Sequence, residues 1–146
     1  MSDSKEGCIV GVETGGEHMV VAAARADRAE PAILERWECA TTRDPAQTLA
    51  DVRALVERAA ARHGPLRAVG VASFGPIDPE PASPTYGCIT STPKPGWRNT
   101  DVLTALGRGD PQFAHVCFVS HLMSGHPPDT HASHALCDTP TGRVGL

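Results

Sequence analysis

The sequence has 146 residues, with 13 basic and 17 acidic side chains and a formal net charge of −4. This length allows one compact domain and excludes a two-lobed enzyme, because a second lobe would need a second core. Acidic and basic residues are mixed along the chain, so no basic stripe favours nucleic acid and no polybasic segment favours lipid. The longest apolar run, Met19 to Ala24, is too short to cross a bilayer, and the polar start is unlike a signal peptide. We therefore expect a cytoplasmic protein that binds a small molecule, with no nucleic acid and no membrane.

The first expected elements are two antiparallel strands joined by a tight turn. Cys8 to Glu13 and His18 to Ala24 are rich in strand-forming residues, and the TGGE sequence between them is typical of a glycine hairpin. A third run, Ala32 to Cys39, follows a segment rich in turn residues and extends the same meander. The N-terminal part therefore predicts three consecutive strands.

A helix follows, and it is the clearest element of the sequence. Asp44 can act as its N-cap, Pro45 suits the first helical position, and Gln47 lies at the capping-box position. Apolar residues then recur at helical spacing, and Gly64 offers a C-terminal stop. The apolar run Leu66 to Ser73 is reached through this crossover, so we expect it to lie parallel to the first strand. The order β-β-β-α-β predicts a mixed sheet of the α/β class.

A long loop comes next, from Phe74 to Asn99. Its six prolines and three glycines exclude a helix or a central strand, and it is too long for a simple connector. Prolines stiffen the backbone, and a rigid loop rich in hydroxyl groups suits the binding of a sugar. Beyond it, Asn99 to Asp101 can cap a short helix through Leu106, with Gly107 ending it.

The composition changes at this point, and we divide the chain into a lobe, residues 1–106, and a tail, residues 107–146. The segment from Arg108 onward holds five of the seven histidines, no lysine and no glutamate. Only Phe113 to Val119 has the pattern of a strand. Such a tail is expected to be irregular, either as a disordered terminus or as the product of a frameshift.

Three side chains of the tail could instead bind a metal ion. His131, His134 and Cys137 follow one another at intervals of three residues, so one helical turn could bring them to a Zn²⁺ ion. A zinc-binding module is therefore a separate hypothesis for the tail.

The segment Gly11 to His18 (GVETGGEH) is a candidate phosphate-binding turn. Its glycines, Gly15 and Gly16, let backbone N–H groups approach phosphate oxygens, and Glu13 before them is available to Mg²⁺. The alternative is a plain hairpin, since glycine supplies the backbone conformation that such turns need. The turn by itself leaves both interpretations open.

The long loop carries a more specific pattern. Ser73 to Asp78 (SFGPID) and Ser83 to Trp97 (SPTYGCITSTPKPGW) resemble the loop of ROK-family sugar kinases of the bacterial fructokinase type. The turn GVETGGEH lies where that family has a phosphate loop of the form E-x-G-G-T-K. The resemblance covers residues 7–106 and thus only the first lobe of a family member.

This resemblance implies the N-terminal lobe of the actin-like, ribonuclease-H-like ATPase fold, truncated and followed by the tail. It also implies ATP-dependent phosphorylation of a hexose, fructose to fructose 6-phosphate, with ATP and Mg²⁺ as cofactors. Family members are often homodimers. By the same resemblance, the residues at ATP and Mg²⁺ are Glu13, Gly15 and Gly16. Those at the sugar are Gly75, Pro76, Thr90, Ser91, Lys94, Gly96 and Trp97.

The sequence departs from the family pattern at functional positions. Glu17 replaces the threonine after Gly-Gly, which places negative charge near a triphosphate, and His18 replaces the lysine. Ser91 stands where fructokinases commonly have asparagine, although its hydroxyl can still donate and accept a hydrogen bond. The aspartate that acts as general base in the family's D-T-D-V-N-G-like segment has no counterpart, so no catalytic residue is assigned.

These losses leave two hypotheses for the lobe. One is an ATP-dependent sugar kinase, and the other is a non-catalytic, truncated remnant that at most binds a sugar weakly. We also expect the fifth strand and a C-terminal helix, which would close the sheet, to be missing.

Overall fold

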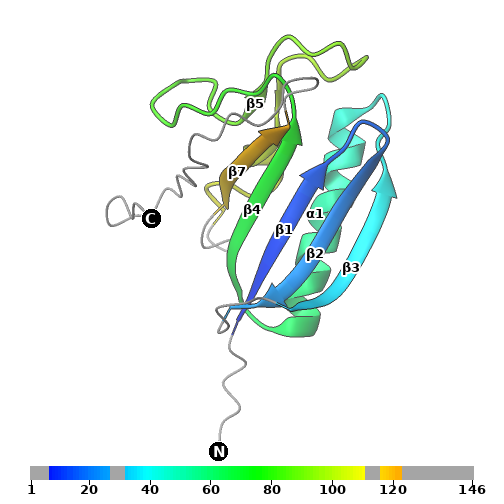
Figure 1. Ribbon diagram of the computed structural model, residues 1–146, viewed down its shortest axis with the longest axis vertical. Helices are drawn as coiled ribbons and strands as arrows, with labels where there is room; N and C mark the ends of the chain where they lie inside the picture. The colour runs from blue at the N-terminus through cyan, green and yellow to red at the C-terminus, as the bar shows by residue number, and fades with distance from the viewer. Residues whose placement is uncertain (1–6, 27–31, 111–115, 123–146) are drawn as a thin grey trace, which may run out of the picture.

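The structure, a computed structural model, describes residues 7–26, 32–110 and 116–122. Its main feature is a five-stranded mixed sheet in the order β3-β2-β1-β4-β7, with the helix α1 on one face (Figure 1). The α/β class and the predicted β-β-β-α-β order are confirmed. The strands are Cys8–Thr14 (β1), His18–Arg25 (β2), Ile33–Ala40 (β3), Leu66–Phe74 (β4) and Val116–Leu122 (β7).

The strands β1 and β2 form the predicted hairpin, and β3 extends it. β1 pairs antiparallel with β2, from Cys8 opposite Arg25 to Thr14 opposite Met19, and β2 pairs antiparallel with β3. Successive side chains of a strand point to opposite faces of the sheet, so every second residue can reach the core. The buried apolar side chains of the hairpin follow this alternation: Cys8, Val10, Val12, Met19, Val21 and Ala23.

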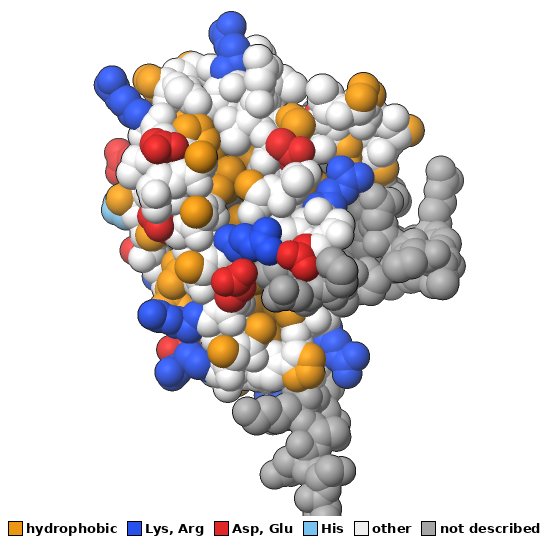
Figure 2. Space-filling view, turned by 180° about the vertical axis from the view of Figure 1, so that it is seen from behind, with side chains coloured by type: hydrophobic (Ala, Val, Ile, Leu, Met, Phe, Trp, Pro, Cys, Tyr) orange, Lys and Arg blue, Asp and Glu red, His pale blue; other side chains and the backbone are white. Residues whose placement is uncertain are grey.

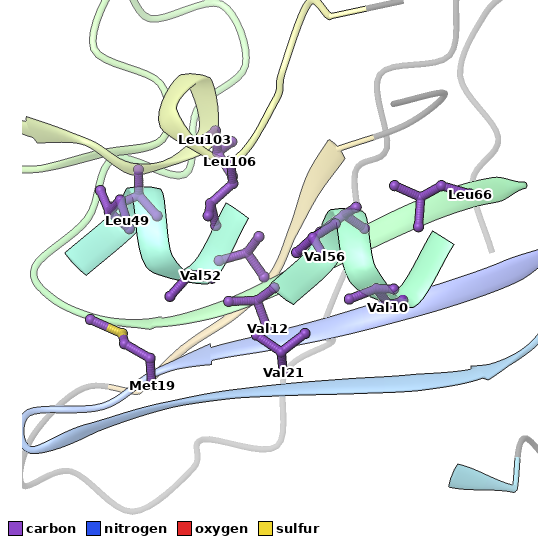
Figure 3. Packing of buried hydrophobic residues seen from close by; sticks show 14 of the residues in the cluster. Val10, Val12, Met19, Val21, Leu49, Val52, Val56, Leu66, Leu103 and Leu106 are labelled. Atoms are coloured by element: carbon purple, nitrogen blue, oxygen red, sulfur yellow. The ribbon is translucent and has the colours of Figure 1, made fainter. Parts of the chain in front are cut away.

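The helix α1, Pro45–His63, begins where the capping pattern predicts. The Asp44 side chain accepts a hydrogen bond from the Gln47 N–H over 3.1 Å. After the last turn comes Gly64, whose φ of 104° is a conformation that favours glycine. The apolar stripe of the helix packs onto the hairpin (Figure 3), and its buried members are Leu49, Val52, Val56 and Ala59.

The strand β4 lies between two parallel neighbours, β1 and β7. The pairing with β1 confirms the predicted crossover. The pairing with β7 shows that the expectation of a missing fifth strand was wrong, because β7 lies within the segment 107–146. The apolar run VCFV is enough to form a ladder with β4 even though the surrounding composition is atypical. The predicted strand Phe113 to Val119 overlaps β7, and residues 113–115 lie outside the described ranges.

The long loop contains a small second sheet that leads into a short helix. β5 (Cys88–Ile89) pairs antiparallel with β6 (Thr100–Asp101), and α2 (Val102–Ala105) follows directly. Asp101 caps α2 by accepting a hydrogen bond from the Thr104 N–H over 3.0 Å. Leu103 and Leu106 are fully buried and lie on the side of α1 that carries Leu49 and Val52 (Figure 3). The loop thus begins at β4 of the main sheet and leads into α2, which packs against α1.

The face of the molecule that carries α1 has acidic and basic side chains interspersed among apolar ones (Figure 2). Ion pairs connect α1 to other segments: Arg53 bonds Asp110, and Arg62 bonds Glu35 of β3 with an N–O distance of 2.7 Å. Within the described ranges, no helix combines the length and the apolar character that crossing a membrane requires.

Candidate functional site

The turn between β1 and β2 is held by its own hydrogen bonds and by Thr41, which follows β3. The Gly15 N–H donates to the His18 carbonyl over 3.0 Å. The Thr41 hydroxyl donates to the Gly15 carbonyl over 2.8 Å, and the Thr41 N–H donates to the Glu17 carbonyl over 2.9 Å. A Cβ at Gly15 would lie 2.4 Å from the His18 carbonyl oxygen, whereas a Cβ at Gly16 would meet nothing within 4 Å. The first glycine is therefore required by the turn itself, and the second leaves open space above it.

Two buried hydroxyl groups lie at the carboxyl ends of the parallel strands β1 and β4. Thr14 and Ser73 are register partners, and the Thr14 hydroxyl donates to the Ser73 oxygen over 2.6 Å. The Ser73 hydroxyl in turn donates to the Phe74 carbonyl over 2.8 Å. Ligands of open α/β sheets bind beyond this edge of the strands. The pair therefore joins the turn after β1 to the loop after β4 at the edge where a ligand is expected.

The first half of the long loop is organised around Asp78. Its carboxylate accepts hydrogen bonds from the hydroxyls of Ser83 and Thr85 and from the Glu80 N–H. Its backbone N–H donates to the Cys88 carbonyl over 3.0 Å. The Ser83 hydroxyl, then the Thr85 hydroxyl and the Glu80 N–H, hold the pKa of the Asp78 carboxyl below its usual range. One carboxylate thus closes residues 78–88 into an ordered substructure.

Gly96 and Trp97 attach the other end of the loop to the start of α1. Gly96 has a φ of +85°, and a Cβ there would lie 2.3 Å from the Arg43 carbonyl oxygen. Trp97 is fully buried, and its indole N–H donates to the Thr42 carbonyl over 2.8 Å. Its ring meets the Phe74 ring edge to face, with centroids 5.3 Å apart. Gly96 and Trp97 therefore fix the position of the loop through their contacts with Arg43, Thr42 and Phe74.

The turn and the loop meet at one open pocket of about 350 Å³. Gly16 lines it from the turn, Phe74 and Gly75 line it from the end of β4, and residues 92–95 line it from the loop. The Lys94 ammonium group donates a hydrogen bond to the Gly16 carbonyl, from a position 78 residues further along the chain. Two motifs that are remote in the sequence are thus neighbours in space.

The predicted sugar-loop residues take different positions around this pocket. Gly75 and Lys94 line it. Pro76 and Thr90 bond to each other, since the Thr90 N–H donates to the Pro76 carbonyl over 2.8 Å, and this contact brings the two sides of the loop together. Ser91 is exposed next to them. Chemically, the exposed hydroxyl and the lysine can both donate hydrogen bonds to a polar ligand.

Three neighbours of the site are not among the predicted site residues, although two of them lie within the loop pattern: Thr41, Phe74 and Thr92. Thr41 binds the turn from 26 residues away, and Phe74 and Thr92 line the pocket. Neither a threonine after a strand nor a phenylalanine at the end of one indicates such a contact, because the contact depends on how distant segments pack.

Of the predicted metal ligands, the structure describes Glu13 but not the three side chains of the tail. Within the described part of the chain, no group of three or more His, Cys, Asp or Glu side chains is placed to hold a metal ion. The predicted zinc ligands His131, His134 and Cys137 lie outside the described residues. Glu13 is a single exposed carboxylate at the end of β1. One such carboxylate suits Mg²⁺, which proteins commonly hold with one or two carboxylates together with phosphate oxygens.

Comparison with known proteins places these segments in one family. The sequence model of the ROK family matches residues 9–110. The chain belongs to the ROK family. The matched ROK segment contains the β1–β2 turn, the long loop and α2, which are the parts of the chain that form and support the pocket.

Several fructokinases are similar to this chain in sequence. A fructokinase from Zymomonas mobilis is 37% identical over 99 residues, which cover 67% of this chain and 31% of that protein. A fructokinase from Streptococcus mutans is 41% identical over 76 residues, which cover 52% of this chain and 25% of that protein. The ROK chain described here thus spans less than a third of the length of these relatives.

Solved structures of ROK proteins share its fold. The ROK hexokinase from Thermus thermophilus superposes with a TM-score of 0.55 and 21% identity, covering 77% of this chain and 35% of the hexokinase. A ROK family transcriptional regulator, a homologue of the E. coli MLC protein, superposes with a TM-score of 0.58 and 11% identity, covering 82% of this chain and 29% of the regulator. These similarities confirm the predicted fold class, the actin-like ATPase type.

Proposed function

We propose that this ROK chain is the phosphate-turn and sugar-loop part of a fructokinase-like enzyme, which transfers phosphate from ATP to a hexose and converts fructose to fructose 6-phosphate. The observation that carries the proposal is the meeting of Gly16 and Lys94 at one pocket. A kinase must hold a hydroxyl of the sugar next to the terminal phosphate of ATP, and positioning of this kind supplies much of the catalysis of phosphoryl transfer. Similarity to fructokinases supports the choice of sugar.

In this proposal the residues of the loop have two different roles. Gly75, Ser91 and Lys94 would face the ligand, since Gly75 and Lys94 line the pocket and Ser91, next to Thr92 in sequence, is exposed. Pro76, Thr90, Gly96 and Trp97 position the loop, because their main contacts are with other parts of the protein. The rigid loop would therefore present its ligand-facing groups without a large ordering cost on binding.

The phosphate side of the site would be formed by the β1–β2 turn. Gly16 leaves space for phosphate oxygens to approach the backbone, whereas the Gly15 N–H is already bonded to His18. Glu13 would share a Mg²⁺ ion with those oxygens, and the ion when bound would neutralise phosphate charge. The two glycines would thus have different roles: Gly15 forms the turn, and Gly16 faces the nucleotide.

A second candidate function is hexose binding without turnover. The observation that favours it is the absence of any acidic residue between Asp110 and Asp129, where the family's general base is expected after the fifth strand. Phosphoryl transfer from ATP requires the sugar hydroxyl to lose its proton, and a carboxylate is the usual acceptor. A chain without that carboxylate would bind fructose but release no ADP.

Two measurements on this chain separate the candidates. Calorimetry with fructose, and with mannose as a competing hexose, tests binding, and a coupled assay with fructose, ATP and Mg²⁺ tests ADP release. The variant Ser91→Ala should weaken fructose binding about tenfold if its hydroxyl contacts the sugar. Arg58→Gln, a change on the exposed side of α1, is the control and should leave binding unchanged.

The outcomes are distinct for each candidate. Fructose binding together with ADP release supports the kinase. Fructose binding with no ADP release supports the second candidate. If fructose gives no heat of binding even at millimolar concentration, both are refuted for this chain.

A further inference from the structure

We infer that the outer edge of β3 is an interaction surface for a second copy of this chain. The two copies of β3 would lie side by side as antiparallel strands, related by a two-fold axis at Trp37, and would join two sheets into one. The inference goes beyond the proposed function and does not rest on it, because strand pairing needs neither a sugar nor ATP. It follows from the position of β3, from its exposed side chains and from its pattern of charges.

The position of β3 is the first observation. It is the last strand on its side of the main sheet (Figure 1). Among the strands of the described residues, only β2 pairs with it. An edge strand presents a row of backbone N–H and C=O groups on its outer side, and these groups can pair with a strand of another chain. β3 therefore offers a template for a further strand.

The exposed apolar side chains of β3 are the second observation. Within the described ranges, the large hydrophobic residues that are exposed both lie on this strand: Ile33 is 64% exposed and Leu34 is 42% exposed. Trp37, in the middle of the strand, is only partly buried against the core. Apolar groups on an unpaired edge favour contact with another chain, because that contact removes them from water.

The charges of β3 are the third observation. Charged residues protect an edge strand from other chains when they meet no opposite charge there. Arg36 and Glu38 are both exposed and lie two positions apart, so they project from the same face of the sheet. Glu35 projects from the other face, where Arg62 and His63 of α1 bond its carboxylate over 2.7 and 2.8 Å. The charge of Glu35 is therefore already compensated, and one exposed charge of each sign remains for a partner.

One two-fold register brings these opposite charges together. Directly opposite residues of an antiparallel pair project from the same face, so a two-fold axis normal to the sheet must pass through a residue. An axis at Trp37 places Arg36 of each copy opposite Glu38 of the other, with the two Trp37 residues opposite each other. An axis at Glu35, Arg36 or Glu38 would set that charged residue against its own copy. An axis at Cys39 would pair neither Arg36 nor Glu38 with an opposite charge.

The short length of this edge makes the dimer weak. The pairing of β3 with β2 shifts register between Ala23 and Ala24, next to Leu34, and such a bulge ends regular pairing. The regular part of the edge therefore runs from Glu35 to Ala40. A ladder of this length is smaller than a standard protein interface, which buries about 1,600 Å². We therefore expect dimers at about 100 μM and above, and monomers at low micromolar concentration.

The test is the molar mass of the 146-residue chain in sedimentation equilibrium, from low micromolar to about 1 mM concentration. Arg36→Glu and Glu38→Arg each turn two attractive pairs of the dimer into repulsive ones, so each should raise the dissociation constant about tenfold or more. Arg98→Glu, the same charge reversal at an exposed residue of the long loop, is the control and should leave the dissociation constant unchanged. Circular dichroism checks that each variant is folded.

Two further measurements test the register. The double variant Arg36→Glu with Glu38→Arg exchanges the two charges and should restore dimerisation. An equimolar mixture of the two single variants should form mixed dimers, because each copy then meets the opposite charges in the other. Recovery in both experiments supports the inference. A chain that stays monomeric at about 1 mM, single variants that dimerise as well as the wild type, or a mixture that associates no better than its components would overturn it.

Discussion

The Trp97 indole N–H donates its hydrogen bond to the Thr42 carbonyl, and this contact joins the end of the sugar loop to the residues that begin α1. Thr42 also bonds Thr48 within the first turn of the helix, with 2.8 Å between the two hydroxyl oxygens. The end of the loop and the start of the helix therefore share one region of polar contacts. A substitution of Trp97 should therefore lower the stability of the protein and change the position of the loop.

We expect Trp97→Phe to destabilise the protein by about 1 to 3 kcal/mol, because an aromatic ring is kept while the Thr42 carbonyl loses its donor. The measurement is the free energy of unfolding from urea denaturation. Trp37→Phe on β3 is the control, since Trp37 is only partly buried against the core, and it should cost less. An equal loss in both variants would show that the indole hydrogen bond adds nothing to ordinary packing.

Gly96→Ala should also be destabilising, by about 1 to 3 kcal/mol, for two reasons that act together. The backbone has a positive φ, and the new methyl group would lie 2.3 Å from the Arg43 carbonyl oxygen. The control is Gly11→Ala in β1, where a Cβ would meet nothing within 4 Å and should change stability by less than about 0.5 kcal/mol. A denaturation midpoint for Gly96→Ala equal to that of the wild type would contradict this account.

The local pattern of the sequence was enough to predict the hairpin, α1 and the crossover to β4. Asp44 and Pro45 predict the helix start because they interact with the residues that directly follow them. The alternation in β1 and β2 predicts strands because only one face of this hairpin is buried. These patterns depend only on residues that are close in sequence, so the elements that they predict can be recognised without knowledge of the fold.

The contacts that build the candidate site are of a different kind. Thr41 reaches Gly15 across 26 positions, and Lys94 reaches Gly16 across 78. No periodicity or capping rule encodes such pairs, since they arise only when the loop folds back over the ends of β1 and β4. The short apolar run was enough to predict a strand that overlaps β7, but its place beside β4 as the fifth strand was not predicted, because that pairing also depends on how distant segments pack.

A double-mutant cycle on Thr14 and Ser73 should show that the two hydroxyls act as a unit. Thr14→Val and Ser73→Ala each remove one partner of a hydrogen bond between two fully buried side chains. Because the second change has no partner left to disrupt, we expect the double variant to lose less than the two single losses combined, with a coupling of about 1 kcal/mol. Strictly additive losses in urea denaturation would mean that the pair does not contribute as a pair.

The carboxyl group of Asp78 should make the loop sensitive to acid. The pKa of Asp78 is held below its usual range by the hydroxyls of Ser83 and Thr85 and by the Glu80 N–H, so the unfolded chain takes up a proton at a higher pH than the folded one. The stability that this group contributes is complete above the ordinary aspartate pKa of about 3.9. It is lost as the pH falls below that value, through the lower pKa of the folded state.

Removal of a hydrogen-bond donor of Asp78 should raise the pKa of its carboxyl group. A titration followed by the NMR signal of the Asp78 carboxyl carbon should give a pKa below the ordinary value in the wild type. The pKa should rise toward that value in Ser83→Ala, which removes the largest of the three contributions. Ser91→Ala removes a serine hydroxyl from the same loop without touching this carboxylate, and it should leave the pKa of Asp78 unchanged. If both variants shift the pKa equally, the loop as a whole sets the charge of Asp78, and the Ser83 hydroxyl has no special part in it.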